Sequence, residues 1–326
     1  MPAQTPGTES SLPPVRLRLP ATSANLGPGF DTLGLALSLY LTVEARQSEV
    51  FHITATGRDA EVCGALTNNL LLMTYNELLA HLGLAAPPLD LRLHNEIPLG
   101  MGCGSSAAAL LAGIFLANHF GQLHWSHQQI LDEACRREGH PDNVGACLFG
   151  GMTSSLMIQT TSVDPEPISV TATCGHDLDW QLFLALPKGG LETSKARAVL
   201  PASYSRVDAI ANIQSTALLV AAFALNRPDL LRGAMRDRLH QPFRQTICPL
   251  LPALLPLSGQ HGVEGVALSG AGPSVLLIAR REVPAPSILR LIRSSAGDQL
   301  AEILVTGVGE PAELLPGPSS NHQVIG

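Results

Sequence analysis

The chain has 326 residues, of which 45% are hydrophobic, and a net charge of −7 at pH 7. Single hydrophobic cores stop growing near about 250–300 residues, so this length predicts two domains. Charged residues make up only 14% of the chain, against roughly 25% in an ordinary globular protein. The sequence is acidic and has no run of Lys or Arg, which argues against nucleic acid as a partner.

The cysteines and the apolar runs indicate the compartment. The six cysteines are scattered, and no two have the C-x-x-C spacing of a zinc site. Without a secretory signal they predict reduced thiols in a cytoplasmic protein. Residues 1–14 are rich in Pro, Ser and Thr and predict a disordered tail. The longest apolar run, 107–117, is shorter than the ~20 residues of a membrane span, so no membrane partner is expected.

Hydrophobic spacing and turn residues predict the elements of the first half of the chain. Asn68 or Asn69 is available to cap the helix that we expect over 70–82. In chain order the elements are a strand over 15–19, a turn-rich segment over 20–31, strands over 33–43 and 89–94 on either side of a helix over 70–82, helices over 107–119 and 127–137, a tight polar turn over 138–145, and a strand after Gly150-Gly151.

The second half begins after a composition shift over 160–175, which marks the expected domain junction. The predicted domains are 15–167 and 168–314, and 315–326 is expected to be a loose tail. The elements expected in this half are strands over 180–186, 265–268 and 275–279 and helices over 210–225 and 230–239.

The strongest local signal for chemistry is a glycine-rich loop between a strand and a helix. Three closely spaced glycines allow the backbone to approach a ligand, and the following helix N-terminus offers unpaired N–H groups and a partial positive charge. Such an arrangement binds phosphate, although a glycine turn capped by serine is the ordinary alternative. The loop matches neither the Walker P-loop nor the dinucleotide pattern. Its residues are Pro98, Leu99, Gly100, Met101, Gly102, Cys103, Gly104, Ser105, Ser106, Ala107 and Ala108.

Two further segments gather polar side chains. Asn25 and Asp31 stand six residues apart around two glycines, and they could converge on an amino-acid ligand or simply bond their own turn. The segment from Glu138 to Asn143 contains His140 and Asp142 next to a proline. A His-x-Asp pair could bind metal, but no third ligand is evident, so a substrate pocket and an ordinary turn are the readings that remain.

Arginines and a second glycine-rich turn complete the candidate residues. Arg197 and Arg244 lie in apolar surroundings, where a guanidinium can bind a carboxylate through two hydrogen bonds. A solvated helix face is the ordinary alternative. The turn over 269–274 has two glycines, and it could line a site or only bring two backbones together.

The order of these segments resembles the GHMP kinase superfamily. Its first motif is similar to Pro20-Ala-Thr-Ser-Ala-Asn-Leu-Gly-Pro-Gly-Phe-Asp31, and its phosphate loop to the segment from Pro98 to Ala107, with Cys103 where the family usually has Leu. The third motif resembles the segment from Leu268 to Ser274. Glu-Gly-His-Pro-Asp-Asn-Val and Thr-Ser-Lys-Ala-Arg-Ala-Val-Leu-Pro are typical of the homoserine kinase branch.

The resemblance implies an α+β fold with two domains. The N-terminal domain would be like the second domain of ribosomal protein S5, and the C-terminal domain would be ferredoxin-like. ATP would lie on the glycine-rich loop, and Mg²⁺ would be held by Ser106 and Glu138, which we favour over Glu133. The substrate implied is L-homoserine, which would become O-phospho-L-homoserine in threonine biosynthesis. The residues expected around it are Asn25, Asp31, His140, Asp142, Arg197 and Arg244.

The resemblance also implies a catalytic strategy. The catalytic residues would be Asn143, beside the reacting hydroxyl, and Asn25. Several sister kinases have an aspartate where this chain has Asn143, so we expect positioning and charge stabilisation without a strong side-chain base. A homodimer is expected from the resemblance alone. The alternatives are a kinase for another small alcohol, a ligand sensor that kept the fold, and a scaffold.

Overall fold

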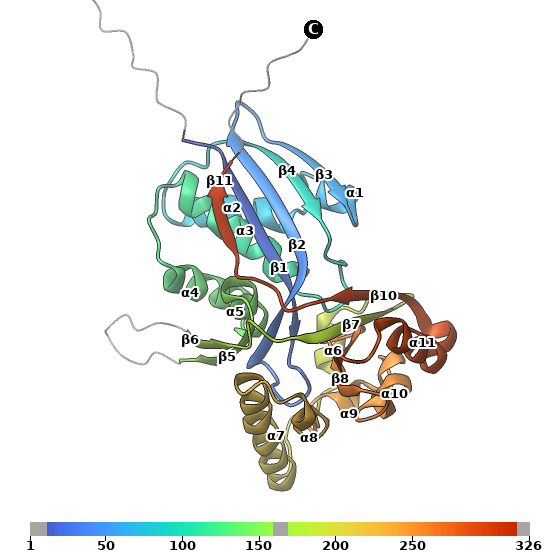
Figure 1. Ribbon diagram of the computed structural model, residues 1–326. Coiled ribbons are helices and arrows are strands. Elements are labelled where there is room, and N and C mark those ends of the chain that lie inside the picture. The colour runs from blue at the N-terminus through green and yellow to red at the C-terminus, as the bar shows by residue number, and fades with distance from the viewer. Residues whose placement is uncertain (1–11, 159–168, 318–326) are drawn as a thin grey trace, which may run out of the picture.

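The computed structural model describes residues 12–158 and 169–317. Its strands form two sheets, one of seven strands and one of four. Figure 1 shows the larger sheet and its helices above the smaller sheet, with the long strands β1 and β2 running down toward the junction. The expected α+β fold in two parts is confirmed.

The larger sheet is built on a long antiparallel pair, β1 with β2, and a break in their register falls between Pro20 and Ala21. The path of the sheet is β11-β1-β2-β4-β3, and β5 pairs with β2 and with β6. Its strands are β1 (Val15–Ala24), β2 (Leu33–Gln47), β3 (His52–Gly57), β4 (Leu89–Asn95), β5 (Met152–Met157), β6 (Ser169–Cys174) and β11 (Glu313–Pro316).

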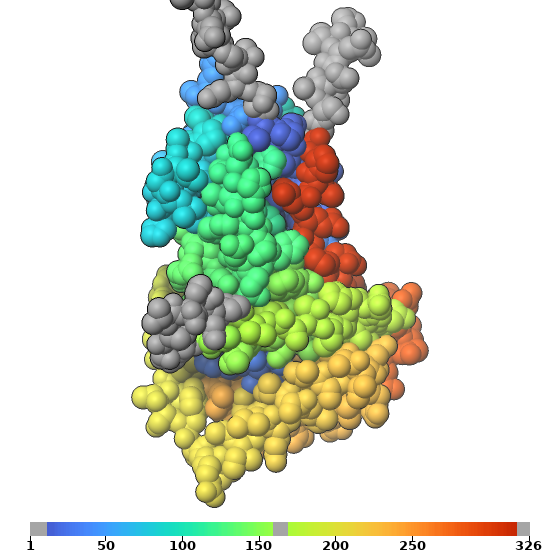
Figure 2. All heavy atoms as spheres, turned by 90° about the vertical axis from the view of Figure 1, so that its left-hand side faces the viewer, coloured from blue at the N-terminus to red at the C-terminus, as the bar shows by residue number. Residues whose placement is uncertain are grey.

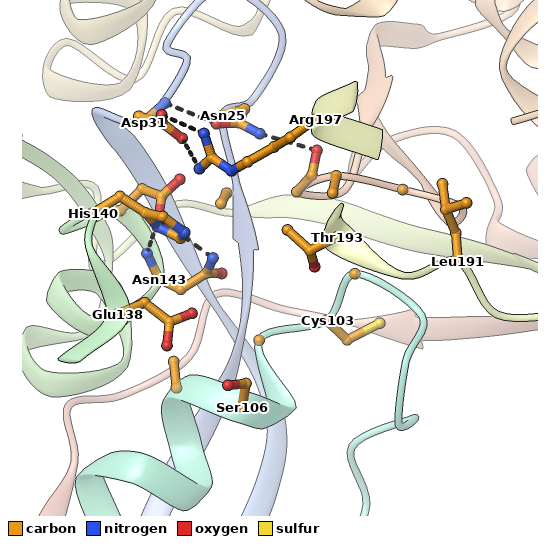
Figure 3. A pocket seen from close by; sticks show the side chains of 18 of the residues that line it. Asn25, Asp31, Cys103, Ser106, Glu138, His140, Asn143, Leu191, Thr193 and Arg197 are labelled. Atoms are coloured by element: carbon orange, nitrogen blue, oxygen red, sulfur yellow. Dashed lines mark hydrogen bonds and ion pairs between the residues drawn. The ribbon is translucent and has the colours of Figure 1, made fainter. Parts of the chain in front are cut away.

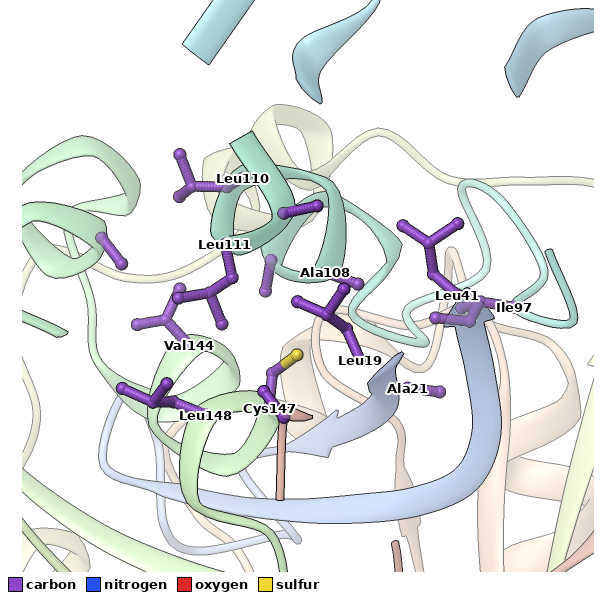
Figure 4. Close-up of a cluster of buried hydrophobic side chains, with 14 of the residues drawn as sticks. Leu19, Ala21, Leu41, Ile97, Ala108, Leu110, Leu111, Val144, Cys147 and Leu148 are labelled. Atoms are coloured by element: carbon purple, nitrogen blue, oxygen red, sulfur yellow. The ribbon is translucent and has the colours of Figure 1, made fainter. Parts of the chain in front are cut away.

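Helices cover one face of this sheet and supply much of the core. Leu111 of the longest of them is fully buried, and it packs near Leu19 of β1 and Val144 of a neighbouring helix (Figure 4). Burying such side chains is the main favourable term in folding. The helices are α1 (Ala60–Cys63), α2 (Leu70–His81), α3 (Ser105–Phe120), α4 (His127–Glu138) and α5 (Asp142–Phe149).

The smaller sheet has the order β10-β7-β9-β8, and all its pairs are antiparallel. With helices after its first and third strands it makes the βαββαβ arrangement of a ferredoxin-like domain. Its strands are β7 (Trp180–Pro187), β8 (Val263–Leu268), β9 (Val275–Arg280) and β10 (Leu300–Thr306), and its helices are α6 (Thr193–Ala198), α7 (Arg206–Ala224), α8 (Leu231–Ala234), α9 (Gln241–Arg244), α10 (Leu250–Leu254) and α11 (Ala285–Ala296).

Most expected elements are present with small shifts at their ends. The helix expected over 70–82 is confirmed as α2, and its cap is Asn69, whose Oδ1 accepts hydrogen bonds from the N–H groups of Leu71 and Leu72. The expected helices over 107–119 and 127–137 are α3 and α4.

Three expectations were wrong. Residues 20–24, expected in a turn, continue β1, because they pair with β2 beyond the register break. The second half of the turn expected over 138–145 is the start of α5, a short helix that is stabilised by burial of Val144 and Leu148. The helix expected over 230–239 is limited to α8, since Asp237 then binds the backbone N–H groups of the following turn.

The expected domain division at 167/168 stays a prediction, but strand pairing adds detail to it. β6 pairs with β5 in the larger sheet, so the chain enters the smaller sheet only after Cys174. β11 returns to the larger sheet and pairs with β1, although residues after 314 were expected to be loose. Figure 2 shows this last strand, in red, beside the green helices of the N-terminal part. The expected tail over 1–14 lies mostly outside the described residues.

One helix in the described part of the chain, α7, is long and apolar enough to cross a membrane by length and composition alone. Only 22% of its most apolar window is buried. Its inner face is tied to the N-terminal part, because Asn212 Nδ2 and Thr216 Oγ1 both donate to the carbonyl of Pro28, at 2.6 and 2.9 Å.

Leu111→Ala tests the core between α3 and the larger sheet. Because Leu111 is completely buried, we expect the free energy of unfolding to fall by about 2–5 kcal/mol. The matched change Leu66→Ala, at a side chain that is 53% exposed, should stay within about 0.5 kcal/mol of the parent. Urea unfolding of both variants measures the difference, and equal losses would contradict the described packing.

Candidate active site

A cavity of about 240 Å³ lies between the two parts of the chain. Segments that are far apart in the sequence line it, and Figure 3 shows their side chains pointing toward one another. The lining comes from the end of β1 and the loop after it, the glycine-rich loop and first turn of α3, the junction of α4 with α5, α6 and the residues before it, α9, and the turn between β8 and β9.

The glycine-rich loop has a backbone that glycine alone adopts easily. Gly104, the residue before α3, has a φ of 69°, and a Cβ there would collide with Oγ1 of Thr22. Gly102 has a φ of 74°, and a Cβ there would collide with the carbonyl oxygen of Ser269. Both values lie in the left-handed region, which a side chain makes costly. These two glycines therefore set the course of the loop.

The first turn of α3 presents N–H groups to the cavity. Ser105, Ser106 and Ala107 all line it. The first bond of the helix runs from the N–H of Ala108 to the carbonyl of Gly104, at 3.1 Å, so the N–H groups of the three preceding residues have no partner inside the helix. Together with the positive end of the helix dipole, they make a site for an anion such as phosphate.

The turn between β8 and β9 closes the cavity from the other side. Ser269 Oγ donates to the carbonyl of Gly102 at 2.7 Å, and the N–H of Gly270 donates to the carbonyl of Ala24 at 3.1 Å. Gly270, Ala271 and Gly272 line the cavity. This turn therefore brings two backbones together and also forms part of the wall.

Asn25 shapes the loop after β1. It is 4% exposed and has a φ of 69°. Its Nδ2 donates to the carbonyl of Gly270 at 2.9 Å, and its Oδ1 accepts from the N–H of Asp31 at 3.0 Å. The local bond that was the ordinary alternative for this residue is therefore present. Asn25 also lines the cavity, and its expected part in catalysis remains a prediction.

The junction of α4 with α5 brings a cluster of polar side chains to the cavity. Asp142, the first residue of α5, is 2% exposed, and its Oδ1 accepts from the backbone N–H of Asn143 at 2.7 Å and lies 2.6 Å from Nδ1 of His140. The N-terminus of α5 favours this negative charge. Oδ1 of Asn143 accepts from Thr22 Oγ1 at 2.6 Å, which fixes the orientation of the amide.

Burial and neighbouring charges shift the pKa values in this cluster. Burial alone would lower the pKa of His140, but the hydrogen bond and charge of Asp142, with smaller effects from Glu138 and Asp31, leave that pKa raised. Burial raises the pKa of Glu138 above its usual value, and the positive charges nearby oppose this only in part. A ligand that supplies positive charge would favour ionised Glu138.

A guanidinium–carboxylate pair occupies the far end of the cavity. Arg197 donates through Nη1 and Nη2 to the two oxygens of Asp31, at 3.0 and 2.8 Å (Figure 3). Both guanidinium groups of the site lie near the ring of Phe30, with the central carbon of Arg197 at 5.6 Å and that of Arg244 at 5.5 Å from its centre. Arg244 is 1% exposed, and burial lowers its pKa.

The structure distinguishes the two glutamates considered for magnesium. Glu138 and Ser106 line the cavity, and the Ser106 side chain acts to lower the pKa of Glu138 against the effect of burial. Glu133 is not in the lining, and its carboxylate is paired with Arg136 and, at 2.6 Å, with Arg137. A hydroxyl and a partly buried carboxylate beside an anion site are the hard oxygen donors that Mg²⁺ prefers.

The structure places Asp31 near His140 and Asp142, as a third candidate metal ligand that the sequence did not reveal. One donor atom each of Asp31, His140 and Asp142 lie within 4.8 Å of one another. Asp31 is already bound to Arg197, and Oδ1 of Asp142 already accepts hydrogen bonds from Asn143. This arrangement favours an ion-pair network over a metal site.

The cavity gathers most of the residues named from the sequence. All six expected substrate residues line it, as do Asn143, Ser106 and Glu138. The roles assigned to them remain predictions. Four residues of the predicted phosphate loop do not line it: Pro98 and Ala108, which are buried, and Leu99 and Met101, which are partly buried.

Other residues of the site were missed. Thr22, which orients Asn143, and Phe30, which lies beside both arginines, stand within the first motif but carried no signal of their own. Thr193 lines the cavity four residues before Arg197. Its place at the start of α6, one turn before a candidate arginine, could have indicated it.

Comparisons with known proteins show the family of the chain. Residues 69–151 match the GHMP kinases N terminal domain, and residues 219–298 match the GHMP kinases C terminal domain. A homoserine kinase of Solibacter usitatus is 45% identical over 265 residues, which is 81% of this chain and 85% of that protein. A homoserine kinase of a Synechococcus species is 36% identical over 316 residues, 95% of this chain and 97% of the other.

The same fold occurs in a solved structure. The crystal structure of homoserine kinase from Cytophaga hutchinsonii has a TM-score of 0.75 and 24% sequence identity, and the match covers 96% of this chain and all of the other. Two matched domains and relatives that span most of the chain at 36–45% identity lead to one conclusion. The chain belongs to the homoserine kinase family of the GHMP kinases.

Proposed function

We propose that this cavity is where the chain transfers the γ-phosphoryl group of ATP to the side-chain hydroxyl of L-homoserine. The product is O-phospho-L-homoserine, an intermediate of threonine biosynthesis. One observation carries the proposal: the cavity has an anion-binding helix N-terminus at one end and an arginine–aspartate pair at the other. The two ends match the phosphates of ATP and the charged groups of an amino acid.

The phosphate end is formed by the glycine-rich loop and the first turn of α3. The free N–H groups of Ser105, Ser106 and Ala107 would bind phosphate oxygens. Ser106 and Glu138 are the residues that would hold Mg²⁺, which supplies positive charge against the phosphates when it is bound. Its presence would also favour the ionised carboxylate of Glu138, whose pKa burial raises.

The amino-acid end would recognise both charges of homoserine. Asp31 and Arg197 bind each other through two hydrogen bonds. An ammonium group can replace the guanidinium at Asp31, and a carboxylate can replace Asp31 at Arg197, so a zwitterion can take the place of the pair. Arg244 would contribute a second guanidinium to the carboxylate. Mevalonate or a sugar lacks the ammonium group and would leave Asp31 uncompensated.

Asn143 would act by position. It lies between the polar cluster and the anion site, and a neutral amide has no proton affinity that would make it a base at neutral pH. Its Oδ1 is held by Thr22, so the amide keeps one orientation. Phosphoryl transfer passes through a loose transition state in which positioning and charge stabilisation dominate.

Two broader properties complete the proposal. The homodimer expected from the family resemblance is kept as part of the proposal, and the free thiols of all six cysteines suit the reducing environment of the cytoplasm.

Release of ADP from Mg·ATP, measured with a panel of alcohols, tests the function. We expect turnover with homoserine and much less with the other alcohols. Serine and threonine carry the hydroxyl one carbon nearer to the amino-acid group, and mevalonate and galactose lack the ammonium group that Asp31 would bind. Turnover with mevalonate in preference to homoserine would refute the assignment of the arginines. Tight ATP binding with no turnover on any alcohol would favour the sensor alternative.

Arg197→Lys tests the amino-acid end. A lysine cannot make the two parallel bonds of a guanidinium, so we expect the KM for homoserine to rise by about tenfold or more, with little change in the KM for ATP. The control Arg46→Lys changes an exposed arginine that is paired with Asp90, far from the cavity lining, and should leave both constants unchanged. An unchanged KM for homoserine in Arg197→Lys would show that this arginine does not bind it.

Asn143→Ala tests catalysis without a base. We expect kcat to fall by roughly a hundredfold, as when one hydrogen-bonding group is removed at a transition state. The basic side of the pH–rate profile should keep its position, because no titrating group has been removed. Loss of a titration from that profile in the variant would contradict the assigned role.

A further inference from the structure

His240 lies outside the cavity lining, and the proposed function assigns it no role. Its side chain is completely buried, one helical turn before Arg244, and its ring stacks on Phe30 with the ring centres 5.2 Å apart. Both ring nitrogens have partners. Nδ1 lies 3.1 Å from Nη1 of Arg244, and Nε2 lies 2.7 Å from the carbonyl oxygen of Gly27.

The partners of His240 determine where its proton lies. A guanidinium can only donate hydrogen bonds, so Nδ1 must be the acceptor for Arg244. Nε2 then carries the hydrogen and donates to the carbonyl of Gly27. Asp237 lies 3.5 Å from Nε2, but its carboxylate already accepts from the backbone N–H groups of the turn that contains His240. Burial lowers the pKa of His240. The charge of Asp237 opposes this and that of Arg244 adds to it, and the pKa remains lowered, which agrees with a neutral ring.

The bond from Arg244 to His240 helps to fix a guanidinium that has no counter-ion. Arg244 also donates from Nε to the carbonyl of Ala196 at 3.0 Å. Among the described residues no carboxylate lies within ion-pair distance of it. A buried, uncompensated charge is costly, and the two bonds hold the guanidinium plane while its remaining N–H groups stay free for a ligand in the cavity.

The second bond of His240 reaches the loop that contains Asp31. The carbonyl of Gly27 is held by His240, and the next carbonyl, that of Pro28, is held by Asn212 and Thr216 of α7. These bonds fix the backbone of the loop at Gly27 and Pro28, a few residues before Asp31. One imidazole thus contacts both the arginine and the loop of the aspartate at the amino-acid end of the cavity.

We propose that His240 is a positioning residue, which holds Arg244 in the orientation that binds the carboxylate of the substrate. It does so as the neutral ring with hydrogen on Nε2, bridging Arg244 and the carbonyl of Gly27. This inference rests on the proposed function, because it takes the substrate to be an amino acid with a free carboxylate.

Two variants separate the two bonds. In His240→Asn the amide oxygen can take the place of Nδ1 and accept from Arg244. In His240→Gln the amide nitrogen can take the place of Nε2 and donate to Gly27, while the acceptor for Arg244 is lost. We expect His240→Gln to raise the KM for homoserine by about tenfold or more, and His240→Asn by less than about threefold. The KM for ATP should stay within about twofold in both.

A substrate without the carboxylate distinguishes positioning from general damage. 3-Aminopropan-1-ol is homoserine without its carboxylate, so Arg244 has no partner on it. His240→Gln should therefore lower kcat/KM for homoserine much more than kcat/KM for this amino alcohol. Equal losses on the two substrates, or equal KM values for homoserine in the Gln and Asn variants, would overturn the inference.

The wild-type protein provides a test that does not need folded variants or turnover. In ¹⁵N-detected imidazole spectra, His240 should show the Nε2–H tautomer, with no change between about pH 6 and 8. A ring with hydrogen on Nδ1, or a doubly protonated ring, would overturn the inference. If the wild type does not phosphorylate homoserine, the proposed function fails, whereas turnover by the wild type with no effect of His240→Gln refutes the inference alone.

Discussion

Contact between two glycine-rich turns holds the site together. Gly102 in the loop before α3 and Ser269 in the turn after β8 approach so closely that a Cβ on Gly102 would collide, and the hydroxyl of Ser269 bonds the carbonyl of Gly102. The same turn binds Asn25 and Ala24 at the end of β1. These backbone contacts join the two sheets at one point. The cavity exists because the chain can come this close only with glycine at these positions.

Charge in the cavity is arranged along its length. The phosphate end relies on N–H groups and a helix dipole, because the loop contains no lysine. The amino-acid end contains two guanidinium groups, Arg197 and Arg244, and one carboxylate, Asp31, so one positive charge remains for a carboxylate ligand. Asp142 and Glu138 lie between these ends. A zwitterion with a terminal hydroxyl fits this order, with its charges at one end and its hydroxyl toward the phosphates.

The sequence predicted those parts of the site that depend on local pattern. Glycine spacing and a following helix indicated the phosphate loop, and an asparagine before an apolar run indicated the cap of α2. The start of α5 was missed because Asp142, Asn143 and Gly145 are poor helix formers, and burial of the apolar residues of the helix outweighs their propensity. His240 was missed because its partners include Gly27, more than two hundred residues away, and no local pattern encodes such a contact.

A crystal structure of the protein with homoserine and a non-hydrolysable ATP analogue tests the central claim most directly. The account predicts that Arg197 leaves Asp31 and, with Arg244, binds the carboxylate of homoserine, while Asp31 binds its ammonium group. The hydroxyl should lie beside Asn143 and face the terminal phosphate on the glycine-rich loop. Homoserine bound elsewhere, or bound here with its carboxylate away from both arginines, would contradict the account.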